Sequence, residues 1–370
     1  MAISYSTQQT TAQVHLLIAR LTDNLVNIRD DGGRFLLKLD DGRVIDTKGW
    51  NDWEWTHGVG LYGLLGYHRL THDPRTLDII TRWFDERFAA GTPTKNVNTM
   101  AAMLTLAYLY EQTGDSRYEP YLDVWAEWVM HEMPRTDEDG LQHIVFNSEN
   151  PQQLWDDTLM MCVLPLAKIG LVLGRPAYVE EAKRQFLLHI KYLTDTRTGL
   201  WFHGWTFDGR HNFARALWAR GNSWITIVIP EFIELLQLPP GDHMREILLG
   251  TLRSQATALC HHQDRESGLW HTLIDDPTSY LESSAAAGFA FGMLKGIRKH
   301  YLDAAYIPYA LRAVEGVIAQ IDERGELRNV SFGTAMGDTL QFYKDIALTS
   351  MPYGQAMAIM CLTEYLHHFI

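Results

Sequence analysis

Six mostly apolar stretches recur along the chain, and each begins at a polar or glycine-rich corner. They begin near Thr56, Asn98, Asp157, Asn222, Ser283 and Tyr353, so that successive starts are 42, 59, 65, 61 and 70 residues apart. A repeat of roughly sixty residues is typical of repeat architectures, and each unit is long enough for two helices. The pattern therefore predicts twelve helices in a closed ring of six hairpins, which is an (α/α)6 barrel of the all-α class.

Two kinds of helix are expected to alternate. The six recurring stretches are apolar on most faces and contain many small residues, such as Gly58, Gly63 and Ala286, which favours burial as inner helices. The segments between them have charged faces, which predicts outer helices over residues 75–88, 118–131, 178–193 and 244–259. The last stretch, residues 355–369, is as apolar as the others, and this suits closure of the ring against the first.

The connections between these helices differ in length. Short corners containing glycine or proline, such as residues 113–118, join each inner helix to the next outer one. The connections back to the inner helices run through about fifteen to twenty residues, which is typical of functional loops. The long loops and the N-termini of the inner helices should therefore share one face, where we expect the site. Pro165 and Pro230, each eight residues after the start of its repeat, predict a shared helix kink.

Composition and charge narrow the possible functions. No linker interrupts the 370 residues, which favours one barrel domain over residues 1–370. The N-terminal stretch has no signal-peptide pattern, no apolar run is long enough for a membrane span, and the three cysteines are scattered, so a cytoplasmic protein is expected. A net charge of −13 argues against nucleic acid or an anionic membrane as a partner. The oligomeric state is not encoded in any pattern, and a monomer or weak homo-oligomer is expected.

One basic segment stands out in this acidic chain. Residues 209–230 contain no acidic side chain, whereas Arg210, His211, Arg215 and Arg220 all lie there. Such a segment is either a solvated cationic helix face or a place for an anionic small ligand. Arg220 opens the fourth inner helix, where an arginine could bind a carboxylate through two hydrogen bonds.

Asp157 is the candidate catalytic residue. It follows Trp155 and Asp156 at the start of an almost wholly apolar helix. One interpretation is that Asp156 or Asp157 caps this helix. The other is that a carboxyl group at the mouth of an apolar ring, beside another carboxyl group, is prepared for general acid catalysis.

The candidate binding residues come from the same face. His203 lies in an aromatic and glycine-rich loop, and Trp224 could stack on a sugar ring. The further candidates open other helices or lie in loops: Trp53, Trp55, His57, Asn98, Trp155, Asn222, Gly333 and Thr334. Asn98 could instead cap its helix, and Gly333 and Thr334 could be turn residues. No nucleotide-binding or metalloprotease motif is present, so neither a cofactor nor a metal is expected.

The helical repeat together with three motifs, at residues 154–161, 202–205 and 218–224, resembles glycoside hydrolase family 105, the unsaturated rhamnogalacturonyl hydrolases. The resemblance covers essentially the whole chain. It implies an (α/α)6 barrel that removes an unsaturated uronic acid from the non-reducing end of a lyase-generated pectin fragment. The small-molecule partner would then be an oligosaccharide with a uronate group.

The resemblance also implies a mechanism. An aspartate matching Asp157 donates a proton to C4 of the C4=C5 double bond, and a water molecule adds to C5. The resulting hemiketal then opens and releases the aglycone sugar. His203 and Arg220 match positions that contact substrate, and Trp224 matches one that stacks on it. A sister family that acts on unsaturated glucuronyl glycosaminoglycan fragments uses a second aspartate. The position compared with it in this chain is Asn98, which favours the pectin branch.

Three alternatives stay open at this stage. The chain could act on glycosaminoglycan-type fragments, or it could be a sugar epimerase or inverting glycosidase on the same fold. It could also be a helical-repeat scaffold that binds a protein, although such scaffolds are usually open solenoids with polar ends.

Overall fold

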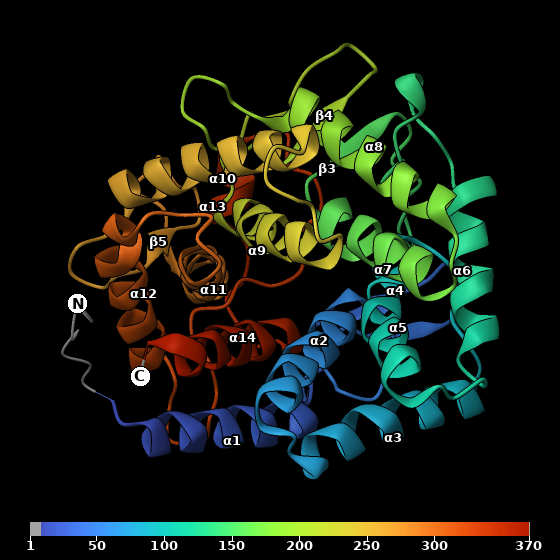
Figure 1. Cartoon of the computed structure of the whole chain (residues 1–370), viewed down its shortest axis with the longest axis horizontal. Helices are drawn as coiled ribbons and strands as arrows, with labels where there is room; N and C mark the ends of the chain where they lie inside the picture. Colours follow the sequence, from blue (N-terminus) through green and yellow to red (C-terminus); the bar gives the residue numbers. More distant parts are fainter. Residues whose placement is uncertain (1–8, 370) are drawn as a thin grey trace.

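The computed structural model describes residues 9–369, and within them two concentric rings of helices form a closed toroid (Figure 1). The inner helices are α2 (Trp55–Thr71), α5 (Ala102–Thr113), α7 (Leu164–Val172), α9 (Ala219–Leu235), α11 (Ser283–Arg298) and α14 (Pro352–His368). The outer helices are α1 (Thr11–Asn27), α3 (Pro74–Ala90), α6 (Glu119–His131), α8 (Pro176–Leu193), α10 (His243–His262) and α12 (Ile307–Ala319). The last inner helix, α14, packs against the first, α2, which closes the ring and confirms the predicted (α/α)6 barrel.

Small residues allow the inner helices to approach closely. A methyl group on Gly63 of α2 would lie 2.9 Å from the β-carbon of Ala356 in α14. Gly58 of the same helix meets Ala101 in a similar way, at 2.6 Å. Since real side-chain contacts are longer, alanine at either position would force the helices apart. The glycines thus fix the spacing of the inner ring.

The third inner helix begins with an irregular turn. The short helix α4 (Val97–Met100) precedes α5 in the second repeat, whereas a π-helical segment, Leu159–Val163, precedes α7 in the third. π-Helical segments are frequent at functional sites, and this one begins two residues after Asp157. Pro165 lies in the first turn of α7, while Pro230 lies within the continuous helix α9. Because α7 continues the π-helical segment without a break, both prolines lie inside helical runs, and the shared kink stays a prediction.

Three small antiparallel sheets organise the long loops. They pair β1 (Leu36–Lys38) with β2 (Val44–Asp46), β3 (Gln153–Trp155) with β4 (Gly204–Thr206), and β5 (Trp270–His271) with β6 (Leu281–Glu282). In the second sheet Trp155 lies opposite Gly204, and the backbone N–H of Asp156 donates to the carbonyl of His203 at 3.0 Å. The loops that carry Asp157 and His203 are therefore fastened to each other.

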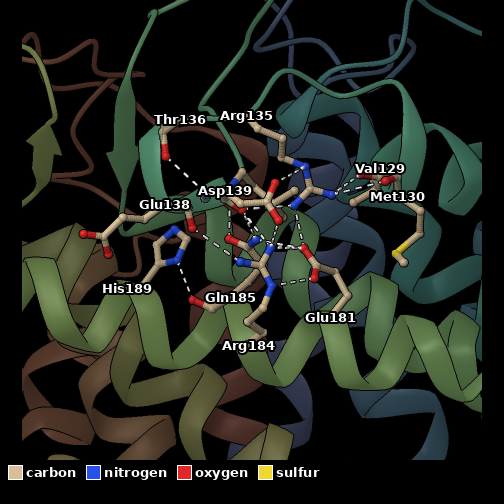
Figure 2. A network of polar contacts seen from close by, with 12 residues as sticks. Val129, Met130, Arg135, Thr136, Glu138, Asp139, Glu181, Arg184, Gln185 and His189 are labelled. Carbon is tan, nitrogen blue, oxygen red and sulfur yellow. Dashed lines mark hydrogen bonds and ion pairs between the residues drawn. The ribbon is translucent and has the colours of Figure 1, made fainter.

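A polar network fixes the loop that follows α6 to the outer helix α8 (Figure 2). Arg135 Nη1 donates to Glu181 Oε1 at 2.5 Å, and Arg184 Nη2 donates to the same oxygen at 2.8 Å. Gln185 Oε1 accepts from the backbone N–H of Leu141 at 2.9 Å. Because Glu181 is largely buried, these charge-assisted bonds are stronger than surface ion pairs. The network anchors the start of the loop that leads to β3 and Asp157.

The described helices are too short or too polar to cross a membrane, because none of them combines the length and the apolar character that a bilayer span needs. The N-terminal stretch used in the signal-peptide argument lies partly outside the described residues.

Candidate active site

A cavity of about 320 Å³ opens at the end of the barrel where the inner helices begin. Its wall includes seven of the predicted site residues, which are Trp55, Asn98, Trp155, Asp157, Arg220, Gly333 and Thr334, and also Glu54 and His143. These residues come from the start of α2, from α4, from the loops around β3 and α9, and from the loop that precedes α14. The cavity thus brings together Asp157 and Arg220 from separate repeats.

Asp157 is held by two side chains at this cavity. Trp224 Nε1 donates to Asp157 Oδ1 at 3.2 Å, and His203 Nε2 lies 3.3 Å from Oδ2. The Asp157 side chain is 17% exposed. Neither Oδ2 nor His203 Nε2 has a hydrogen bond of good geometry with any described residue. The carboxyl group is therefore oriented by Trp224, and its second oxygen lies buried beside His203.

His203 is fixed on its far side. Its Nδ1 lies 2.8 Å from the hydroxyl group of Tyr343, and its ring packs against Trp155 and Trp218, with centroids 5.2 and 4.3 Å away. Burial lowers the pKa of His203, although the neighbouring Asp157 acts in the opposite direction. When Nδ1 accepts a hydrogen bond from the hydroxyl group of Tyr343, the single proton of the neutral imidazole is on Nε2, facing Asp157.

The two adjacent aspartates have opposite electrostatic environments. Asp156 is 0% exposed, and burial together with the charge of Asp157 raises the pKa of Asp156 well above its ordinary value. Burial would also raise the pKa of Asp157, but His203, His143 and Arg220 outweigh it and lower that pKa overall. The pair therefore keeps one proton under conditions in which an isolated pair would hold none.

Arg220 both makes hydrogen bonds within the protein and lines the cavity. Its Nη1 donates to the carbonyl and hydroxyl oxygens of Ser331, at 3.0 and 2.7 Å, to the carbonyl of Phe332 at 3.0 Å and to the hydroxyl of Tyr353 at 2.7 Å. Its Nε is buried without a partner, and within residues 9–369 no carboxylate forms an ion pair with it. The guanidinium group also lies over Trp55, 5.5 Å from the ring centre. Arg220 lines the cavity without a carboxylate partner among the described residues, and a guanidinium group held in this way suits a ligand carboxylate.

Glu54 is a second carboxyl group in the cavity wall. It accepts from Asn98 Nδ2 at 2.9 Å and from the backbone N–H of Trp55 at 2.7 Å. Burial, only partly offset by these two hydrogen bonds, raises the pKa of Glu54 from 4.5 to about 7. Asn98, predicted as either a cap or a binding residue, thus lines the cavity and positions Glu54.

This shift has a consequence for stability. As the pH rises from 4.5, Glu54 ionises first in the unfolded chain, so the free energy of unfolding should fall by about 3 kcal/mol by pH 7 and then level off. Glu54→Gln should remove that part of the slope, whereas Glu132→Gln, at an exposed position, should leave it unchanged. Urea unfolding at pH 5 and pH 7 measures the difference, and identical slopes in wild type and Glu54→Gln would contradict it.

Five predicted binding residues do not line the cavity. Two of them, His203 and Trp224, contact Asp157 instead, and Trp224 is fully buried, so the prediction that it stacks on a sugar ring is wrong. The other three are Trp53, His57 and Asn222. Trp53 donates from Nε1 to the carbonyl of Thr99 at 2.9 Å and stacks on Trp125 in the core. His57 is fully buried, with Nε2 2.6 Å from the carbonyl of Gly49. The side chain of Asn222 bonds to the backbone of Trp201, because Asn222 Oδ1 accepts from the N–H of Trp201 at 2.8 Å. All three side chains turn into the protein because their polar atoms are needed there.

The structure also shows residues that the sequence argument missed. His143 stacks on Trp155 with ring centroids 4.1 Å apart, and its Nδ1 lies 2.9 Å from the hydroxyl of Thr158. Burial lowers the pKa of His143 to about 3, so its imidazole is neutral at physiological pH. Tyr343 contacts His203 from the short helix α13 (Leu340–Lys344), which is distant in sequence. Neither residue lies near an apolar repeat start, which is the signal that revealed the others.

Three side chains at the site could together hold a metal ion. Among the described residues, Asp156, Asp157 and His203 form a group whose donor atoms lie within 4.8 Å of one another. Carboxylate and imidazole donors suit several divalent cations. The enclosed position of Asp156 instead favours proton exchange with Asp157, and the expectation that the protein needs no metal stays a prediction.

A known protein family matches almost the whole chain. The model of Glycosyl Hydrolase Family 88 matches residues 27–369. The chain therefore belongs to this family and is a glycoside hydrolase. The resemblance to unsaturated rhamnogalacturonyl hydrolases that the sequence motifs indicate is confirmed.

The chain is similar to particular relatives within and near this family. The chain is 59% identical to the crystal structure of a possible member of the GH105 family from Salmonella enterica serovar Paratyphi A, with a TM-score of 0.98 over 100% of this chain and 97% of that one. A possible GH105 member from Klebsiella pneumoniae gives 60% identity and a TM-score of 0.97, over 100% and 96%. The unsaturated rhamnogalacturonyl hydrolase YesR of Bacillus subtilis is 34% identical over 317 residues, which cover 85% of this chain and 90% of YesR.

Proposed function

We propose that this hydrolase removes the unsaturated uronic acid from the non-reducing end of rhamnogalacturonan oligosaccharides produced by a lyase. The family and the similarity to YesR support this substrate class. The observation that carries the proposal is the position of Asp157 between Trp224 and His203, in the same cavity as Arg220. The protein thereby offers a proton donor and an anion-binding group to one small ligand.

The cavity suggests how the sugar is oriented. The uronate carboxylate pairs with the guanidinium group of Arg220, an arrangement that fixes both distance and plane. Trp55 and Trp155, which line the cavity, provide aromatic surface for the faces of the sugar ring. Two fixed contacts of this kind would leave the double bond of the substrate directed toward Asp157.

The reaction then needs one carboxyl group. Protonated Asp157 donates its proton to C4 while the C4=C5 electron pair forms the new C–H bond, and positive charge develops at C5. Ionised Asp157 next accepts a proton from the water molecule that bonds to C5, so it acts first as acid and then as base. The hemiketal opens and releases the aglycone. An ordinary glycosidase, in contrast, places two carboxyl groups at the anomeric carbon.

A panel of lyase-generated oligosaccharides tests this proposal. The ultraviolet absorbance of the enol ether should disappear, with equimolar release of the aglycone, when the protein meets an unsaturated galacturonyl–rhamnose disaccharide. An unsaturated glucuronyl disaccharide from a glycosaminoglycan should react far more slowly. Faster loss of absorbance with the glycosaminoglycan fragment would overturn the substrate class, and no reaction with any unsaturated uronide would overturn the function.

The bond from Trp224 to Asp157 should matter for the rate. Trp224→Phe removes a hydrogen bond to a charged group, which is worth about 1.5–3 kcal/mol, so kcat should fall about 10- to 100-fold. Trp201→Phe is a matched control, because Trp201 is equally buried but its Nε1 has no partner among residues 9–369. Steady-state kinetics of both variants check this, and an equal fall in kcat would assign the effect to packing alone.

A further inference from the structure

Asp156 is an unusual neighbour for a catalytic carboxyl group. It is fully buried, and neither of its side-chain oxygens accepts a hydrogen bond from any described residue. Its backbone is fixed on both sides, because its N–H donates to His203 and its carbonyl accepts from Leu159 at 3.2 Å. The carboxyl group also lies directly against Gly221, where even a methyl group would collide with it. It therefore cannot turn away to find another partner.

An ionised and unpartnered carboxylate in this position would be costly. A protonated one would not, because its O–H can donate to Asp157, the polar side chain next to it. The titratable and charged groups around the pair are His203, His143, Tyr343 and Arg220. Burial and the charge of Asp157 raise the pKa of Asp156, and Arg220 opposes them. The buried position therefore stores a proton.

The proposed reaction leaves a gap that this proton fills. The neighbouring His203 and the charge of Arg220 favour the ionised form of Asp157, which lowers its pKa and leaves it without a proton to donate at neutral pH. A general acid must carry its proton when the substrate arrives. The proton cannot come from the wall of aromatic side chains around Asp157, since tryptophan Nε1 does not ionise in this range.

We propose that Asp156 holds the proton that Asp157 delivers to C4, so that the two adjacent carboxyl groups work as one proton-sharing pair. This inference rests on the proposed function. In the first step the proton moves from Asp156 to Asp157 and from there to C4. In the second step Asp157 takes a proton from the water that adds to C5 and returns one to Asp156. The pair ends with the proton it had, and the net reaction consumes one water.

The test is the pH profile of Asp156→Asn. The amide keeps the shape of the side chain and can still donate a hydrogen bond to Asp157, but it cannot supply a proton. Wild-type kcat should persist through neutral pH and fall only in alkali. The variant should keep its KM within a factor of about three, lose about 100-fold in kcat at neutral pH, and recover activity as the pH falls, because Asp157 must then be protonated by solvent.

Two other outcomes would be decisive. A uniform loss of activity at every pH, with the profile unmoved, would show a structural role and overturn the inference. Wild-type protein without activity on unsaturated uronides would instead overturn the proposed function, and it is measured first. Should Asp156→Asn fail to fold, carbon NMR of wild-type protein with labelled aspartate decides the matter. One carboxyl group should remain protonated above neutral pH, and the absence of any such group would overturn the inference.

Discussion

Asp157→Asn is expected to lower kcat about 1,000- to 10,000-fold with little change in KM. The asparagine can still accept from Trp224 at its oxygen, so the local hydrogen bond and the fold should be preserved. What it loses is the proton for C4 and the base for the attacking water. Initial rates of absorbance loss measure the effect, and thermal unfolding shows whether the fold is intact.

A matched control is Asp208→Asn, since Asp208 is an exposed carboxyl group just after β4, near the same loops. It should retain wild-type kinetics. Activity of Asp157→Asn within tenfold of wild type would remove Asp157 from the role of general acid. Parallel losses in both variants would point to a general charge effect on this face.

Arg220→Lys is expected to have the second largest effect, a decrease in kcat/KM of about 100- to 1,000-fold. A lysine keeps the positive charge but loses the planar pair of donors that a uronate carboxylate requires. It also abandons the bonds that Nη1 makes to Ser331 and Tyr353, so some loss of stability should accompany it.

The methyl ester of the uronate separates these two effects. Wild-type protein should prefer the free acid strongly over the ester, and Arg220→Lys should lose most of that preference. The ratio of the two kcat/KM values does not depend on how much of the variant is folded. Arg210→Gln, at an exposed position in the same basic segment, should leave the ratio unchanged. An unchanged ratio in Arg220→Lys would contradict the assignment of the carboxylate to this guanidinium group.

The toroid could be predicted from the sequence because apolar stretches recur about every sixty residues. Each apolar repeat marks an inner helix, each charged segment an outer one, and closure follows from the apolar last helix. The common face of the long loops follows from the same alternation. The prediction that Asp157 and Arg220 lie on this face agrees with the cavity, which both residues line although they are far apart in the chain.

The directions of the side chains in the site could not be predicted from the repeat. A helix start tells where a residue lies along the barrel axis but not which way its side chain turns. Trp55 faces the cavity while His57, two positions later, is turned into the protein by its bond to Gly49. Tyr343 reaches His203 through a tertiary contact from the short helix α13, which is not one of the six apolar repeats.

The central claim is that Asp157 protonates an alkene carbon and that water bonds to C5. A brief reaction of the wild-type protein in water labelled with heavy oxygen, stopped by borohydride to fix both carbonyl groups, tests it directly. Mass spectrometry of the reduced sugar fragment then locates the label. We expect the heavy oxygen at C5, with none at C1 or in the aglycone. Label at C1 would show attack on the anomeric carbon, as in an ordinary glycosidase, and would contradict the account.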